Sequence, residues 1–472
     1  MNHPNLLLIT TDQQRFDAMG FNNNPVLRTP MMDNLAATGV NFERAYTTCP
    51  SCIAARRTIL TGQAPSTHGM TGYQDGVEFF PKFTLPGLLS GAGYQTQLVG
   101  KLHQFPQRKR YGFDNMIMSS SPTNRPDSAW MAHNDYIDWL KDHCFEDAAS
   151  ELGINGNSRI ARPWHLAEQY HHTNWLTSEA IEFMTRRRDP SSPFFLHLSY
   201  WAPHPPLIPP QAYYDRYMKH DNLLPRIGSW ATGFKSVPSG IAGDSATGPF
   251  RADEIHDAIA GYYGLVNHID DQLQRLLEAY FVYGGPRSKD PLWIIFTSDH
   301  GEMLGDHHLF RKSLAYESSS HIPFFISGRN VPIKPTSSRA LVCLEDVLPT
   351  LLDLAGVPIP DDVDGKSLKP VLTGEVPTVR EHIHGEHSGG FANHFIVYER
   401  YKYIWFAKTN EEQIFDLQDD PHELQDLSAD LQLLRPMRQR LAERLKGRTD
   451  YNYDAAGLRP LNNRAPSVFW KT

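Results

Sequence analysis

The segment that decides the fold of this chain reads Cys52-Ile53-Ala54-Ala55-Arg56-Arg57-Thr58-Ile59-Leu60-Thr61-Gly62. A helix over this segment would place Cys52 and Arg56, one turn apart, on the same face. A thiol beside a cation suits a nucleophile that acts on an anionic substrate. Two simpler interpretations stay open at this point. Cys49 and Cys52 form a CxxC pair, which can indicate a redox or metal site, and a single cysteine is most often a small buried residue.

The composition limits the classes of protein to which the chain can belong. A chain of 472 residues is too long for one hydrophobic core. We therefore expect a large domain, residues 1–375, and a smaller one, residues 376–472. Apolar residues at 40% and charged residues at 21% are typical of a globular protein. The net charge of −8 argues against a nucleic-acid partner, so an anionic substrate must meet a local cluster of cations.

Neither the cysteines nor the apolar runs indicate a secreted or membrane protein. Four cysteines are too few for a disulfide framework. The apolar run at residues 6–9 is too short for the core of a signal peptide. No run approaches the roughly 18 apolar residues that span a bilayer. We therefore expect a cytoplasmic protein with no membrane partner.

Short apolar segments alternate with helical patterns along the first 375 residues. We expect strands at residues 5–11, 40–46, 94–99, 194–200, 292–296 and 322–327, and helices at residues 30–39, 84–92, 134–143, 175–187, 255–280 and 344–354. This alternation predicts an α/β fold, with a large mixed, mostly parallel sheet between helices.

The pattern changes after about residue 375. Closely spaced β-type segments at residues 394–406 and a charged helix at residues 433–446 predict a small C-terminal α+β domain with an antiparallel sheet. Earlier in the chain, residues 105–170 look irregular. Residues 208–250, rich in Gly, Pro and Ser, are expected to run over the surface near a site.

Reactive side chains follow four of the predicted strands. They are Asp12-Gln13, Lys101 with His103, His204, and Asp299-His300. Ligands of open α/β sheets bind beyond the carboxyl ends of the strands, so we expect these groups and the cysteine helix to converge. Each motif alone has an ordinary explanation, such as a helix cap at Asp12 or a solvated turn at Lys101. Their common placement favours a site.

These motifs resemble those of a type I sulfatase of the alkaline-phosphatase-like superfamily. That family's signature is a cysteine, any residue, usually a proline, a small residue and an arginine, then a Leu-Thr-Gly-like end. The stretch from Cys52 to Gly62 fits it in one frame, because counting from Cys49 would put Ile53 in the arginine position. Five further blocks follow in the family's order: Asp12-Gln13, Gly100-Lys101-Leu102-His103, Pro203-His204-Pro205-Pro206-Leu207, Asp299-His300-Gly301-Glu302 and Lys312-Ser313-Leu314-Ala315-Tyr316-Glu317.

The resemblance implies a nucleophile and a metal. In this family the cysteine is oxidised to formylglycine, and the hydrated aldehyde attacks the sulfur of a sulfate ester, so Cys52 would be the modified residue. One divalent cation would be held by Asp12, Gln13, Cys52, Asp299 and His300. Calcium is implied by the family, and manganese is the alternative because the set includes an amide and an imidazole.

The same resemblance assigns five catalytic side chains. Arg56, beside Lys101, would stabilise the attacking oxygen. Lys101, His204 and Lys312 would surround the sulfate oxygens. His204 or Lys312 would protonate the leaving oxygen, and His103 would take a proton from the second hydroxyl of the hydrate.

Departures from the family pattern keep two questions open. Gln13 and His300 replace the more usual aspartate and amide, and the same pairs occur in related phosphonate monoester and phosphodiester hydrolases, which are the alternative function. The Lys101/His103 pair favours a sulfatase. Ala54 replaces the proline, which implies maturation by a radical-type maturase. A catalytically silent binding protein is a third hypothesis, disfavoured by the intact set.

The motifs leave the alcohol part of the substrate open. We expect a sulfate ester of a sugar, a phenol or another small alcohol, selected by residues 105–170 and 208–250 and by the stretch from His384 to His394. Four tryptophans could stack on a sugar ring or enclose a quaternary ammonium, and they could equally be packing residues: Trp130, Trp139, Trp175 and Trp201.

Overall fold

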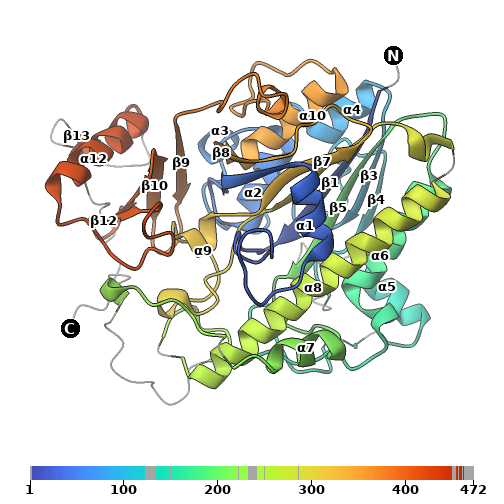
Figure 1. Cartoon of the computed structure of the whole chain (residues 1–472), viewed down its shortest axis with the longest axis horizontal. Coiled ribbons are helices and arrows are strands. Elements are labelled where there is room, and N and C mark those ends of the chain that lie inside the picture. The colour runs from blue at the N-terminus through green and yellow to red at the C-terminus, as the bar shows by residue number, and fades with distance from the viewer. Residues whose placement is uncertain are drawn as a thin grey trace.

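Two sheets organise the chain (Figure 1). The structure is a computed structural model that describes residues 3–448 except 123–133, 146, 149, 222, 232–241, 249 and 285, together with residues 453, 454, 457–459 and 461. One sheet has eight strands and the other has four. A further pair of short strands, β13 (Tyr453–Asp454) and β14 (Gly457–Leu458), lies near the C-terminus.

The eight-stranded sheet has the order β4-β3-β5-β1-β6-β7-β2-β8. The five strands from β4 to β6 are parallel, β7 runs antiparallel to both of its neighbours, and β8 is parallel to β2. The predicted mixed, mostly parallel sheet is therefore confirmed. Its strands are β1 (Asn5–Asp12), β2 (Val40–Tyr46), β3 (Gln95–Gly100), β4 (Asn115–Met118), β5 (Phe194–Pro203), β6 (Leu292–Ser298), β7 (Phe324–Arg329) and β8 (Thr336–Cys343).

The two edge strands were not predicted. β4 has four residues, and β8 begins with the polar stretch Thr336 to Arg339, of which three residues are exposed. An edge strand has a partner on one side only and can turn polar residues to solvent, so it lacks the continuous apolar run of a central parallel strand.

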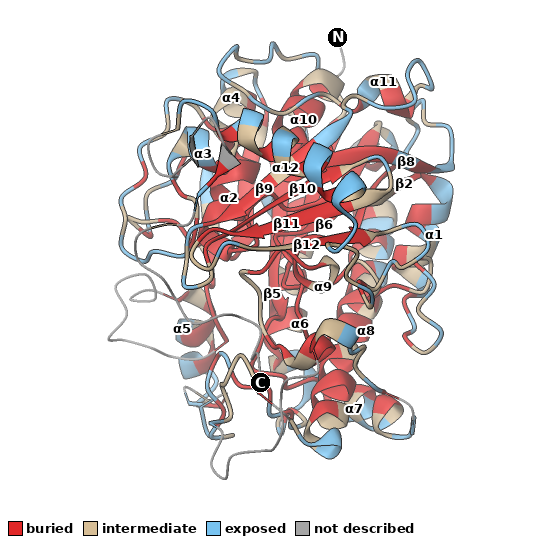
Figure 2. Ribbon diagram, turned by 90° about the vertical axis from the view of Figure 1, so that its left-hand side faces the viewer, coloured by how far each residue is buried: buried red, intermediate tan, exposed pale blue. Residues whose placement is uncertain are grey.

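Helices cover both faces of this sheet because its strands are apolar on both sides. Along β1, Leu7 and Ile9 pack with α1, α6 and α8, while Leu6 and Leu8 pack with α2, α4 and α10 on the opposite face. Figure 2 shows the strands buried, with exposed surface on the outer sides of the helices and on the loops. The helices are α1 (Pro30–Thr38), α2 (Cys52–Thr61), α3 (Pro65–His68), α4 (Leu85–Gly91), α5 (Asp135–Asp142), α6 (His172–Glu182), α7 (Gln211–Met218), α8 (Ala252–Tyr283), α9 (Glu317–Ser320), α10 (Val347–Ala355), α11 (Lys369–Leu372) and α12 (Leu431–Leu445).

The region 208–250 is more regular than its composition indicated. It contains α7, which packs on α8 and buries Tyr213 and Tyr217. Two tyrosines one turn apart give a short helix an apolar face in spite of the surrounding Gly, Pro and Ser. Trp175 belongs to the hydrophobic core and the half-buried Trp139 packs against it, so both are packing residues. Trp130 lies outside the described residues.

The C-terminal sheet is antiparallel, as predicted, with the order β12-β11-β10-β9. One face packs on α12, and the other packs on the main body around Leu314 and Tyr316. The boundary at residue 375 stays a prediction. The strands are β9 (His382–His387), β10 (Asn393–Tyr398), β11 (Tyr401–Phe406) and β12 (Glu411–Asp416). None of the described helices combines the length and the apolar character needed to cross a membrane.

Candidate active site

Neighbouring parallel strands bring the predicted groups together. β1 lies between β5 and β6, and β3 lies beside β5, so their carboxyl ends share one edge of the sheet. Asp12 ends β1, while Lys101, His204 and Asp299 directly follow β3, β5 and β6. The N-terminus of α2 places Cys52 at the same edge, so the expected convergence is observed.

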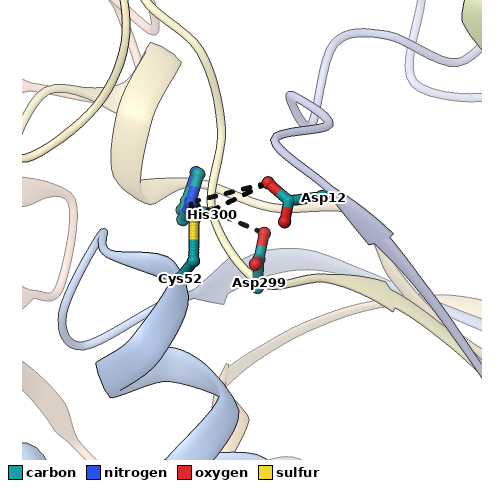
Figure 3. Close-up of side chains that lie close together, drawn as sticks. All are labelled: Asp12, Cys52, Asp299 and His300. Atoms are coloured by element: carbon teal, nitrogen blue, oxygen red, sulfur yellow. Dashed lines mark hydrogen bonds and ion pairs between the residues drawn. The ribbon is translucent and has the colours of Figure 1, made fainter. Parts of the chain in front are cut away.

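Four buried side chains form a compact group of ligand atoms (Figure 3). Asp12, Cys52, Asp299 and His300 each offer one atom, and these atoms all lie within 4.8 Å of one another. The Cys52 Sγ is 3.1 Å from His300 Nε2. Oδ1 of Asp299 and Oδ1 of Asp12 are 3.6 and 3.9 Å from the same nitrogen. Two carboxylates and an imidazole are ligands that divalent cations accept in proteins.

The backbone fixes the orientation of the His300 ring. Its Nδ1 lies 2.9 Å from the carbonyl oxygen of Gly301 and donates a hydrogen bond to it. Nε2 then faces the carboxylates and Cys52, which is the orientation of a metal-binding histidine. Gly301 has no room for a side chain, because an added Cβ would lie 2.1 Å from the carbonyl oxygen of Ser318.

Two buried cations neutralise the carboxylates. Arg56 donates to Asp12 Oδ2 and to Asp299 Oδ2, each at 3.0 Å. Lys101 Nζ is 2.5 Å from Asp12 Oδ2 and 4.1 Å from the centre of the Trp201 ring. Arg56 also donates to the carbonyl oxygen of Lys101 at 2.8 Å, which ties α2 to the end of β3. A buried carboxylate needs such partners.

The charges around Cys52 favour its thiolate. Burial opposes the ionised form, but Lys101, Lys312 and His300 together lower the pKa of the thiol well below its ordinary value. Burial and the neighbouring charge of Asp12 raise the pKa of Asp299. The site is therefore electropositive at Cys52, where an anionic substrate has to approach.

Lys312 joins His204 and Gln13 on the other side of the group. Its ammonium is 2.8 Å from His204 Nε2 and 2.6 Å from Gln13 Oε1. His204 Nδ1 donates to the carbonyl oxygen of Pro205 at 2.8 Å, so its Nε2 accepts from Lys312. Burial and the charge of Lys312 lower the pKa of His204 to about 4. The proton that these two side chains share therefore resides on Lys312.

His103 lies at the same cavity and faces Asp75. Its Nε2 is 3.7 Å from Asp75 Oδ1, and its ring is 6.1 Å from that of Tyr73. Burial acts against ionisation of Asp75, but hydrogen bonds from His103 and Tyr73 lower the pKa of its carboxyl. The imidazole thus lines the cavity over Cys52 and has an acidic partner, which suits a proton acceptor.

Cys49 takes no part in this arrangement. It packs in an apolar cluster with Ile53, Ala54 and Met70. Burial raises the pKa of its thiol, and the cysteines form no disulfide. The redox interpretation of the CxxC pair therefore has no support, and Cys52 is the thiol beside the ligand group.

A cavity of about 370 Å³ opens over Cys52. Sequence patterns had indicated Lys101, His103, His204 and Lys312, and Asn157, Ala246 and His387 come from the three stretches expected to select the substrate. Ser51, Tyr73 and Arg311 had not been identified. Ser51 and Arg311 directly precede Cys52 and Lys312, so adjacency was an available signal. Tyr73 had none. The cavity is lined by Ser51, Cys52, Tyr73, Lys101, His103, Ser121, Gly156, Asn157, Trp201, His204, Ala246, Arg311, Lys312, Ser313, His387, Gly390 and Phe391.

Comparisons with known proteins agree on one family. A family model described as Sulfatase matches residues 4–357, and one described as N-sulphoglucosamine sulphohydrolase, C-terminal, matches residues 305–450. An arylsulfatase of Clostridium perfringens is 40% identical over 436 residues, which cover 90% of each chain.

Solved structures share the fold. One, in complex with its substrate D-glucosamine-2-N,6-O-disulfate, superposes with a TM-score of 0.74 at 22% identity and covers 94% of this chain and 98% of its own. A phosphonate monoester hydrolase of Agrobacterium radiobacter superposes with a TM-score of 0.73 at 24% identity and covers 94% of each chain.

Proposed function

Because the chain belongs to the sulfatase family of the alkaline-phosphatase-like superfamily, we propose that it cleaves sulfate esters through a nucleophile made from Cys52. The enzyme is a sulfuric ester hydrolase that releases an alcohol and inorganic sulfate. The observation that carries the mechanism is the placement of the Cys52 Sγ, 3.1 Å from His300 Nε2 and within the group formed with Asp12 and Asp299.

A divalent cation fits this group of side chains. Asp12, Asp299 and His300 would hold it together with modified Cys52, and Gln13 would add an amide oxygen. The cation would supply Lewis-acid activation of the nucleophile and charge neutralisation at the sulfate. Calcium is our first choice and manganese the alternative. Stripping the metal with a chelator and restoring turnover with either ion alone would decide between them.

The nucleophile depends on conversion of Cys52 to formylglycine, whose hydrate offers one hydroxyl for attack on sulfur and a second for release of sulfate. Arg56 and Lys101, both buried, hold positive charge where the attacking oxygen and the sulfate oxygens gather. His103, with Asp75 behind it, takes the proton from the second hydroxyl.

The leaving oxygen receives its proton from the Lys312–His204 pair. Lys312 carries that proton and lies 2.8 Å from His204 Nε2, while Pro205 holds the opposite side of the imidazole. The pair can pass a proton to an alkoxide without rearranging its backbone contacts. We propose Lys312 as the acid and His204 as the residue that orients it.

Maturation and location belong to the same proposal. Ala54 occupies the position of the family's proline, so a radical-type maturase is the partner we propose. We propose the cytoplasm as the compartment, because none of the four cysteines is in a disulfide.

The decisive measurement combines mass and turnover. Co-expression with a radical-type maturase should lower the mass of the peptide containing Cys52 by about 18 Da, since the thiol becomes an aldehyde. The same preparation should hydrolyse an aryl sulfate, and the Cys52→Ala variant should not. The Gln13/His300 pair makes a phosphonate hydrolase the alternative to test. A fully converted preparation that cleaves an aryl phosphonate monoester but no sulfate ester would contradict our proposal and support that alternative.

A further inference from the structure

Two residues that line the cavity over Cys52 each carry a buried polar atom with no role in the mechanism above. The two atoms are the hydroxyl of Ser51 and Nε2 of His387. Both residues are almost fully buried, with 1% and 3% of their surface exposed. Within the described part of the chain, neither atom has a hydrogen-bond partner. Buried polar groups of native proteins are nearly always paired, so this pair calls for an explanation.

The backbone fixes what each of these atoms can do. The amide of Gly389 donates to His387 Nδ1 at 3.0 Å, so Nδ1 is an acceptor and the ring proton is on Nε2. His387 therefore presents an N–H donor. Ser51 precedes α2 in the position of an N-cap, but its side chain makes no capping bond. Its hydroxyl thus keeps both its donor and its acceptor capacity.

Hydrogen bonds hold the segment that carries His387 against the segments that carry Ser51 and Tyr73. The amide of Glu386 donates to Thr48 O and the amide of Ser388 donates to Thr71 O, each at 2.7 Å. These bonds fix the β9–β10 turn against the segment before Cys52 and the loop that carries Tyr73. We call Ser51, Tyr73, His387 and Phe391 the neutral wall.

Charge distinguishes the neutral wall from the cationic residues that line the same cavity. Lys101 and His204 stand at the ends of β3 and β5, next to Trp201. With Lys312 they supply the positive charge that the sulfate needs. The neutral wall supplies uncharged donors and two aromatic rings, which suits an uncharged alcohol.

We propose that Ser51 and His387 bind a hydroxyl group on the alcohol part of the substrate, so that the enzyme prefers sulfate esters with a second hydroxyl near the ester. This inference rests on the proposed function. A hydroxyl can accept from His387 Nε2–H and exchange a hydrogen bond with Ser51 Oγ, which would satisfy both atoms at once. Sugars and catechols carry such a hydroxyl, and a plain phenyl ester would leave both atoms unpaired.

A matched set of substrates tests this. We would measure kcat/KM for phenyl sulfate and for 2-, 3- and 4-hydroxyphenyl sulfate with wild type, Ser51→Ala and His387→Leu. The ratio of each hydroxyphenyl ester to phenyl sulfate is the readout. It does not depend on the fraction of enzyme that has folded and matured, since that fraction cancels. Comparison of variant with wild type also cancels the intrinsic reactivity of each ester.

For at least one isomer, we expect the wild-type ratio to fall roughly tenfold in each variant, the size of one lost hydrogen bond in a buried site. His387→Gln retains an N–H donor and should restore part of the ratio. The exposed neighbour Ser388→Ala is the control and should leave the ratio unchanged.

Other outcomes would overturn the inference. Ratios that stay at the wild-type value for all three isomers in both variants would exclude a bound hydroxyl. An equal loss on all four esters leaves these ratios unchanged and counts against the inference in the same way. Turnover of no sulfate ester by a matured preparation would refute the proposed function itself, which separates the two failures.

Discussion

Two of the lysines that the structure describes are completely buried, one at the end of a strand of the large sheet and one within the C-terminal sheet, and they serve different purposes. Lys402, on β11, has three protein acceptors for its ammonium: Glu317 at 2.8 Å, Ser320 at 3.0 Å and Glu423 at 3.3 Å. Lys101, at the end of β3, has Asp12 as its one acceptor among the described residues, and it borders the cavity over Cys52. An ammonium has three protons to donate. The protein therefore satisfies the hydrogen-bond donors of Lys402, whereas Lys101 keeps donors for a ligand.

Burial of a charged side chain therefore does not by itself mark an active site. Lys402 joins β11 to Glu317 of the main body, so its ion pairs hold the C-terminal sheet in place. Lys101 has the same burial, but it lines a cavity together with Cys52, the proposed nucleophile, and has unused donors. What identifies a site is buried hydrogen-bonding capacity that the chain leaves unused.

The largest expected effect comes from removing the nucleophile beneath Lys101. Cys52→Ala should lower aryl-sulfatase turnover by at least about 10⁴-fold, since no other residue at the site can form the aldehyde. The substitution leaves the Lys402 contacts intact, so the thermal midpoint should stay close to that of wild type. Turnover and calorimetry on matched preparations measure both. Residual activity within tenfold of wild type would remove Cys52 from its role.

Removing the ion pairs and hydrogen bonds of Lys402 should affect folding rather than catalysis. Lys402→Met leaves the buried Glu423 and the half-buried Glu317 without their lysine, which costs about 3–5 kcal/mol of unfolding free energy. Turnover per folded molecule should remain close to wild type.

Chemical denaturation measures the effect of this change, and Lys369→Met is the matched control. Lys369 pairs with Asp353 at 2.9 Å on the surface and should contribute less than about 1 kcal/mol. Equal losses of unfolding free energy in the two variants would show that the ion pairs of Lys402 contribute no more than a surface ion pair.

Substitution of Lys101 should affect catalysis rather than folding, in contrast to Lys402→Met. Lys101→Met removes a positive charge from the place where the sulfate oxygens gather, and kcat should fall by about 10²–10³-fold. Its effect on stability should be smaller than that of Lys402→Met, because Asp12 keeps the ion pair with Arg56 at 3.0 Å. If Lys101→Met instead unfolded the protein and left kcat intact, the distinction between the two lysines would be wrong.

The smallest effect is a pH dependence within the Lys402 network. Burial raises the pKa of Glu423 to about 7, and the neighbouring Glu317 adds to the increase. A carboxyl whose folded pKa is raised stabilises the fold most below its unfolded pKa, and this contribution is lost as pH rises through the folded value.

Wild type should therefore lose roughly 2 kcal/mol between pH 5 and 8 through this group. In Glu423→Gln that decrease should be smaller. Thermal unfolding of both proteins across this range measures the two slopes, and parallel curves would contradict the assignment.

Much of the site was predictable because local patterns carry it. Asp12 and Asp299 each follow an apolar run typical of a buried parallel strand, and the rule that ligands bind at strand ends brings them together without further information. The helix from Cys52 to Thr61 ends at Gly62, with a φ of 66°, where glycine adopts the left-handed conformation easily.

Other elements were not predictable from local patterns. β8 is an edge strand whose first residues are polar, so its pairing with β2 had no periodic signal. Trp175 could equally have been a ligand-stacking residue, and its contact with Tyr136, at 5.4 Å between ring centres, decides that it packs in the core. No short-range pattern distinguishes a tryptophan that packs from one that binds.

The sequence by itself determined the alternation of strands and helices, the nucleophile segment and the charged groups at the strand ends, because these depend on neighbours a few residues apart. Only the tertiary structure decided that Lys402 is saturated while Lys101 is not, and that His387 and Ser51 line the same cavity. Such pairings join segments distant in the sequence. Whether a buried polar atom finds a partner depends on where the whole chain places its acceptors, and no local sequence pattern encodes that.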